Sequence, residues 1–232
     1  MQLGPFDYVV WVVGFLLEAY VVVCSFARKD FFRYLSLNLY MLMVALVTFG
    51  QYHCIRHYGF NSHAYFYYFY YSDSLLYILM YFVVIHFYQQ VFEEMKVSRY
   101  IRGAAVLLLA ATAFFSFIVV HEYKDHLSTR FVVELEQNLN FVGVVLVYLL
   151  WGAILKLRET RTRLIQLVLA LGISYSATAS AYALMNLFPG AYMLHWVPPI
   201  VGVWLPLAWA YTFTKVSEDA RLATARLAVG TR

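Results

Sequence analysis

The chain has 232 residues, of which 63% are hydrophobic and only 13% charged, and its mean hydropathy is +0.66. Soluble domains carry about 25% charged residues, so this composition excludes a soluble globular domain and is typical of a helical membrane protein. The long, continuous apolar runs also exclude the short alternating segments of an outer-membrane barrel. The formal net charge of +4 indicates basic cytoplasmic loops.

Seven apolar segments follow one another along the chain. Each is long enough to cross a hydrocarbon core of ~30 Å as a helix, the one form that pairs all backbone polar groups within a single segment. We therefore predict an all-α membrane protein, with a seven-transmembrane helix bundle over residues 1–214 and a short basic cytoplasmic tail over residues 215–232. The predicted spans are Phe6–Ala27, Tyr34–Ile55, Tyr67–Phe92, Ile101–Val120, Leu135–Leu155, Leu164–Leu187 and His195–Thr214.

Basic residues predict the orientation of this bundle. Of the 17 lysines and arginines, all except Arg56, Lys124 and Arg130 fall in the first, third and fifth connections or in the tail. By the positive-inside rule, the N-terminus lies outside and the C-terminus lies in the cytoplasm. An even number of spans would place two of the basic groups on the wrong side of the membrane.

Two residues interrupt the apolar pattern inside predicted spans. Pro206 lies near the middle of the seventh span, where it should kink or loosen the helix, either as a hinge or as an ordinary bend. Glu18 lies about midway along the first span, where a carboxyl group is costly and should face a partner or a cavity. It is either a functional group (ligand contact, proton relay or switch) or a neutral acid hydrogen-bonded between helices. The candidate partners are Asn38, His86, Tyr175 and Ser176.

The stretch from Gln51 to Asp73 holds three of the seven histidines and an unbroken aromatic run, Tyr65–Tyr71. We expect a loop that joins the second and third spans, with helix ends on either side. Tyrosine is enriched at the headgroup level, so an aromatic belt is one interpretation of the run. A stacking platform for a ligand and a contact surface for a partner subunit are the others.

Further polar side chains are predicted at the same outer level. Asp73 opens the third span, while Asn138 and Asn140 open the fifth. Together with nearby tyrosines they could line an outward-facing pocket, and interfacial placement without a pocket is the alternative. The candidate ligand-binding residues are Glu18, Tyr70, Tyr71, Asp73, Tyr77, His86, Asn138 and Asn140.

The histidines allow a metal, pH-sensing or haem site. Imidazole and carboxylate groups four residues apart can share a helix face, and together they suit a transition metal or a proton sensor. A b-type haem would need two axial histidines at similar depth on different helices. Solvated interfacial residues are the alternative to all three. The candidate ligands are His53, His57, His121, Asp125, His126 and His195.

The sequence contains no hydrolytic triad, phosphate-binding glycine loop, CxxC pair or nucleic-acid module, so no catalytic motif supports an enzyme. The plan is similar in topology to the seven-helix input modules of bacterial signalling proteins. We predict a receptor-like or accessory protein of a bacterial inner membrane. It would sense a small ligand, lipid or ion from outside and act through a protein partner or a homo-oligomer. The alternatives are a haem- or quinone-binding redox subunit, a small transporter and a structural subunit of a larger membrane complex.

Overall fold

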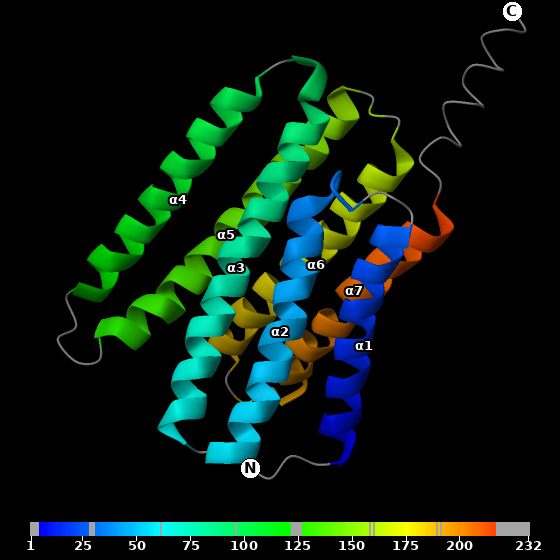
Figure 1. Ribbon diagram of the computed structural model, residues 1–232. Coiled ribbons are helices and arrows are strands. Elements are labelled where there is room, and N and C mark those ends of the chain that lie inside the picture. The colour runs from blue at the N-terminus through cyan, green and yellow to red at the C-terminus, as the bar shows by residue number, and fades with distance from the viewer. Residues whose placement is uncertain are drawn as a thin grey trace, which may run out of the picture.

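The computed structural model describes residues 5–27, 31–60, 62–95, 97–121, 127–157, 159, 161–188, 190 and 192–216. Over these ranges the chain is all-helical, which confirms the predicted fold class. Two 3-10 turns, η1 (Glu93–Met95) and η2 (Tyr192–Trp196), accompany the α-helices. The α-helices are α1 (Pro5–Ala27), α2 (Leu35–Tyr58), α3 (His63–Val91), α4 (Ser98–His121), α5 (Leu127–Lys156), α6 (Thr162–Leu187) and α7 (Val197–Lys215), shown in Figure 1.

Each predicted span corresponds to one helix. Within the described ranges, five helices (α2 to α6) are long and apolar enough to cross a membrane, and the protein is an integral membrane protein. The side chains that the structure describes in α1, Trp11–Ala27, form a shorter apolar helix, and α7 is not among the five. Both nevertheless belong to the bundle, because α1 packs against α2 and α7, and α7 packs against α6. The predicted tail beyond residue 216 lies outside the described residues.

The connection between α2 and α3 is much shorter than the loop expected over Gln51–Asp73. Gly59 ends α2 with a positive φ of 82°, a conformation that glycine adopts without a steric penalty. Ser62 then caps α3, since its side-chain oxygen accepts a hydrogen bond of 3.1 Å from the Tyr65 backbone N–H. The aromatic run Tyr65–Tyr71 is therefore helical, and α3 begins at His63, slightly before the predicted span Tyr67–Phe92.

Six helices form a closed ring. In order of contact they are α1, α2, α3, α5, α6 and α7, and α7 returns to α1. The remaining helix, α4, packs on the outside against α5 and α3, as Figure 1 shows. Tyr81 of α3 fastens α4 by donating a 2.7 Å hydrogen bond to the backbone carbonyl of Ala105.

The ring is solidly packed near one end. This end carries the connections α1–α2, α3–α4 and α5–α6 and the last residues of α7. We call it the basic end, because Arg33, Arg99, Arg102, Lys156, Arg161, Arg163 and Lys215 lie there. Among its fully buried side chains are Trp209 and Phe213 of α7, and the Phe213 ring meets Tyr34 edge-on at 5.6 Å. The placement of the basic end in the cytoplasm stays a prediction.

Candidate functional site

A cavity of about 440 Å³ lies inside the ring, towards the end opposite the basic end. All six ring helices contribute to its wall. Along α3 the lining runs from Phe69 to Met80, about 16 Å at 1.5 Å per residue, or roughly half of a hydrocarbon core. The volume falls in the range of about 300–1,000 Å³ typical of small-molecule sites.

Two buried side chains in the cavity wall carry oxygen atoms without a hydrogen-bond partner. Glu18 of α1 is 6% exposed and its Oε2 is unpaired, while Thr48 of α2 lies within hydrogen-bonding reach of its carboxyl group. Asn140 of α5 is 4% exposed and its Oδ1 is unpaired. A buried polar atom left without a partner costs about 1–3 kcal/mol, so these two atoms are candidate ligand contacts.

A second carboxyl group, that of Asp73 on α3, also lines the cavity. The Tyr40 side chain of α2 lines the same wall and is close enough to both Glu18 and Asp73 to feel their charge. Behind Asp73, the buried Glu136 of α5 interacts with Asp73 and lies within hydrogen-bonding reach of Tyr77. Three carboxyl groups from three helices therefore converge on this half of the bundle.

Six aromatic side chains form much of the wall: Trp11, Tyr40, Phe69, Tyr77, Tyr175 and Tyr182. Tyr77 and Tyr182 lie within hydrogen-bonding reach of each other across α3 and α6. Tyr175 is 2% exposed, and its ring packs directly on Gly143 of α5, where any Cβ atom would overlap it. The glycine therefore lets α5 and α6 approach closely and fixes the position of the ring.

The electrostatic character of the cavity is one-sided. Its described lining includes two acidic residues, Glu18 and Asp73, and no lysine, arginine or histidine. Within the membrane the low dielectric strengthens the field of any ionised carboxylate. The cavity therefore favours a guest that is positively charged or that donates hydrogen bonds.

Four predicted ligand-binding residues, Glu18, Asp73, Tyr77 and Asn140, come together in this cavity. The others lie elsewhere. Asn138 donates hydrogen bonds to Ser116 of α4 at 3.0 Å and to Glu134 at 3.3 Å. Tyr70 packs on Phe66 at 4.4 Å within α3, and Tyr71 is 48% exposed.

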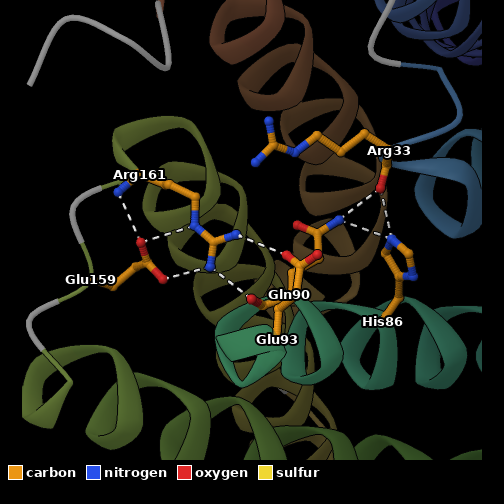
Figure 2. Close-up of polar contacts among 6 residues, drawn as sticks. All are labelled: Arg33, His86, Gln90, Glu93, Glu159 and Arg161. Atoms are coloured by element: carbon orange, nitrogen blue, oxygen red, sulfur yellow. Dashed lines mark hydrogen bonds and ion pairs between the residues drawn. The ribbon is translucent and has the colours of Figure 1, made fainter. Parts of the chain in front are cut away.

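His86 belongs to a polar cluster at the basic end, which Figure 2 shows. Its Nε2 lies 2.8 Å from the backbone carbonyl of Arg33, and Gln90 donates to the same carbonyl at 2.7 Å. The Gln90 Nε2 also lies 2.9 Å from the His86 Nε2, so His86, Gln90 and the Arg33 carbonyl form one polar cluster. His86 thus joins α3 to the α1–α2 connection, far from the cavity.

Arg161, at the start of α6, extends the same cluster to the α5–α6 connection (Figure 2). Its guanidinium donates to both carboxylate oxygens of Glu159, at 3.0 and 2.7 Å, and to the backbone carbonyl of Gln90 at 2.7 Å. It also lies 3.7 Å from Glu93. The hydrogen bonds that Arg161 donates to Glu159 raise the pKa of Arg161, so the pair stays ionised. We call Arg33, His86, Gln90, Glu93, Glu159 and Arg161 the basic-end latch.

The predicted metal ligands are dispersed over the part of the chain that the structure describes. His53 and His57 do share a helix face, with ring centroids 4.4 Å apart, and both are exposed. His121 is exposed and stacks on Phe117 of its own helix. Within the described ranges no three histidine, cysteine, aspartate or glutamate side chains lie close enough to hold one metal ion. Asp125, His126 and the side chain of His195 lie outside the described residues.

Sequence reasoning missed several residues of the wall. The predicted partners of Glu18 included Tyr175, which shares the cavity, but Asn38 donates instead to Ser25 at 2.8 Å and Ser176 pairs with Tyr148 at 3.2 Å. The spacing of polar and small residues along two helices could have identified these wall residues. Trp11, Gly14 and Glu18 recur on one face of α1, and Ser174, Tyr175, Thr178 and Tyr182 form a polar stripe along α6.

Comparison of the chain with protein-family models, with curated proteins and with solved structures finds no match. The cavity and its chemistry therefore carry the functional argument by themselves.

Proposed function

We propose that this protein is a receptor-like membrane protein that binds a small ligand in the cavity of the six-helix ring. The observation that carries the proposal is a pair of buried residues, Glu18 and Asn140, that each have an unpaired oxygen atom and that both line a cavity of ligand size. Membrane proteins seldom leave such groups unsatisfied, because no solvent within the bilayer compensates them. A ligand that reaches the cavity from the predicted outer side would compensate both.

The seventh helix supports the receptor role. Pro198, Pro199 and Pro206 of α7 all line the cavity. Pro206 lacks a backbone N–H, so the carbonyl of Gly202, which lines the same wall, loses its helical partner. The far end of α7 is held by Arg163 of α6, whose guanidinium donates to the backbone carbonyl of Val216 at 2.9 and 3.1 Å. A ligand that bends α7 at Pro206 would alter this contact, next to the predicted cytoplasmic tail.

The basic-end latch favours a receptor over a transporter. It ties α3 to the α1–α2 and α5–α6 connections, and the large buried side chains of the ring lie on the same side of the cavity. A transporter would have to open this packed half, whereas a receptor needs only the cavity and a helix that responds to it.

Blocking the cavity tests the proposal. Gly14 is buried in the wall, and a Cβ atom there would first meet the Glu18 Oε1, at an ordinary contact distance of 3.9 Å. We expect Gly14→Ala to keep ligand binding and Gly14→Leu to fill the cavity and abolish it. The measurement is stabilisation of the purified protein against heat by a panel of small cations, neutral molecules and anions.

The proposal fails if no class of small molecule stabilises the wild type more than it stabilises Gly14→Leu. Uptake of the stabilising molecule into sealed vesicles, abolished by Gly14→Leu, would replace the receptor role by a transporter.

A further inference from the structure

The chemistry of the cavity narrows the ligand to one class. Both unpaired buried atoms, Glu18 Oε2 and Asn140 Oδ1, are hydrogen-bond acceptors. Two acceptors require a ligand that donates hydrogen bonds. A carboxylate or phosphate ligand only accepts them, so it does not fit these two atoms. Asp73 adds a further acceptor group to the same wall.

The charge of the wall favours a cation over a neutral donor. Glu18 and Asp73 supply two acids, and the described lining offers no basic side chain to neutralise them. A hydrogen bond between charged partners contributes about 1.5–3 kcal/mol, against about 1 kcal/mol between neutral ones. The desolvation free energy of a buried cation is therefore better compensated beside these acids than elsewhere in the bundle. The bound cation in turn gives the acids a partner of opposite charge.

The aromatic wall points the same way. Tyr40 and Tyr175 line the cavity together with Glu18 and Asp73. Aromatic faces attract ammonium groups by about 0.5–2 kcal/mol, and they also accept the apolar body of an organic molecule. A bare metal ion has no apolar body to place against these rings, and within the described ranges no three potential metal-ligating side chains lie close enough to hold one.

We infer that the cavity binds a small organic ammonium ion that carries N–H donors, with Glu18 and Asn140 as its hydrogen-bond acceptors and Asp73 as a second negative charge. This inference rests on the proposed function, since it names the class of ligand for the same cavity. The N–H donors distinguish the ligand from a quaternary ammonium ion, which would satisfy the charge but leave both oxygen atoms unpaired.

A matched series of ligands tests the inference at neutral pH. The series comprises 2-phenylethylamine, which is a cation there, its neutral analogue 2-phenylethanol, the anion phenylacetate, and the quaternary trimethyl derivative of the amine. Binding is measured by calorimetry on the purified wild type. We expect the amine to bind at least about tenfold more tightly than the alcohol and the quaternary ion, and phenylacetate not to bind. Amines from methylamine to tryptamine cover the range of sizes.

Two variants locate the binding. Glu18→Gln keeps the shape of the side chain but removes its charge, and should weaken amine binding by about 10- to 100-fold while changing alcohol binding little. Glu134→Gln removes the same charge from α5 outside the cavity, where Glu134 accepts from Asn138, and should change amine binding by less than about twofold.

Three results would overturn the inference. One is equal or tighter binding of the alcohol, the anion or the quaternary ion. Another is amine binding that survives both Glu18→Gln and Gly14→Leu, which would place the amine elsewhere. The third is no binding of any amine up to about 10 mM. If another class binds and Gly14→Leu abolishes it, the ammonium assignment fails while the proposed function stands.

Discussion

Unpaired buried oxygen atoms occur at both ends of the six-helix ring, but among the described residues only those at one end belong to the wall of a cavity. At the basic end, Arg161 reaches Glu159, Glu93 and the backbone of Gln90, while Asn38, Gln90 and Thr162 each keep one unpaired buried oxygen outside the cavity. Glu18 and Asn140 are also buried and each has an unpaired oxygen atom, but both residues line the cavity.

This contrast separates a structural use of polarity from a functional one. Paired groups stabilise the fold, so removing one partner leaves the other buried alone and destabilises the protein. Unpaired groups in the wall of a cavity destabilise the ligand-free fold, and we expect them to be retained because they bind a ligand, which is the usual trade-off between stability and activity. Substitutions at the two ends should therefore change stability in opposite directions.

The largest effect is expected for Arg161→Ala. It removes the guanidinium contacts to Glu159, whose side chain is 11% exposed, and to the Gln90 carbonyl, while the backbone N–H of residue 161 still donates to Glu159. We expect a loss of about 2–3 kcal/mol in the free energy of unfolding, measured by denaturing-detergent titration. Arg161→Lys keeps the charge but not the bidentate hydrogen bonding to Glu159, and should recover part of the lost unfolding free energy. An unchanged stability of Arg161→Ala would show that the latch does not hold this end.

The next effect concerns the wall of the cavity. Gly143→Ala drives a methyl group into the Tyr175 ring and should cost about 2 kcal/mol of unfolding free energy. Gly152→Ala on the same helix is the matched control, because a Cβ atom there meets nothing within 4 Å. That control should be neutral or stabilise by up to about 1 kcal/mol through helix propensity. Equal effects at the two glycines would mean that Tyr175 is not fixed by this contact.

A smaller effect of opposite sign is expected for Glu18→Leu. Replacing the unpaired carboxyl group by an apolar side chain should raise the unfolding free energy of the ligand-free protein by about 1–2 kcal/mol. The same denaturing-detergent titration measures it. A clear loss of stability would indicate that Glu18 is a structural group satisfied within the bundle, which is the alternative left open by the sequence.

The smallest effect on stability accompanies a test of orientation. Tyr58 near the cavity end and Tyr100 near the basic end are 66% and 78% exposed, so cysteine at either position should change stability by less than about 0.5 kcal/mol. Both are made in a Cys24→Ser, Cys54→Ser background, since the two native cysteines are free. A membrane-impermeant thiol reagent should label Tyr58→Cys in intact cells and Tyr100→Cys only after permeabilisation. The reverse pattern would place the cavity on the cytoplasmic side.

The sequence predicted the helices well because each span is a long apolar run. Such a run crosses a membrane as an α-helix, which pairs its backbone polar groups internally. The sequence predicted too long a connection within the Gln51–Asp73 stretch, where the tight turn depends on a positive φ at Gly59 and on the Ser62 cap. These local signals are weaker than the polarity of the stretch, which suggested a longer loop.

The cavity could be predicted only in part. Glu18, Asp73 and Asn140 were identified because polar residues are rare in spans. Thr48 and Tyr182 were missed, since their contribution depends on which helices are neighbours in the ring, and no pattern within one helix specifies that. His86 was expected to bind a ligand, but it lies in the basic-end latch because its turn of α3 faces the α1–α2 connection.

An experimental density map of the protein in a lipid nanodisc with saturating 2-phenylethylamine tests the central claim most directly. The account predicts density for the ligand inside the ring, with its nitrogen within hydrogen-bonding distance of Glu18 and Asn140 and with the basic-end latch intact. An empty cavity, a cavity filled by a lipid chain, or a Glu18 carboxyl group fully paired with protein groups would contradict it.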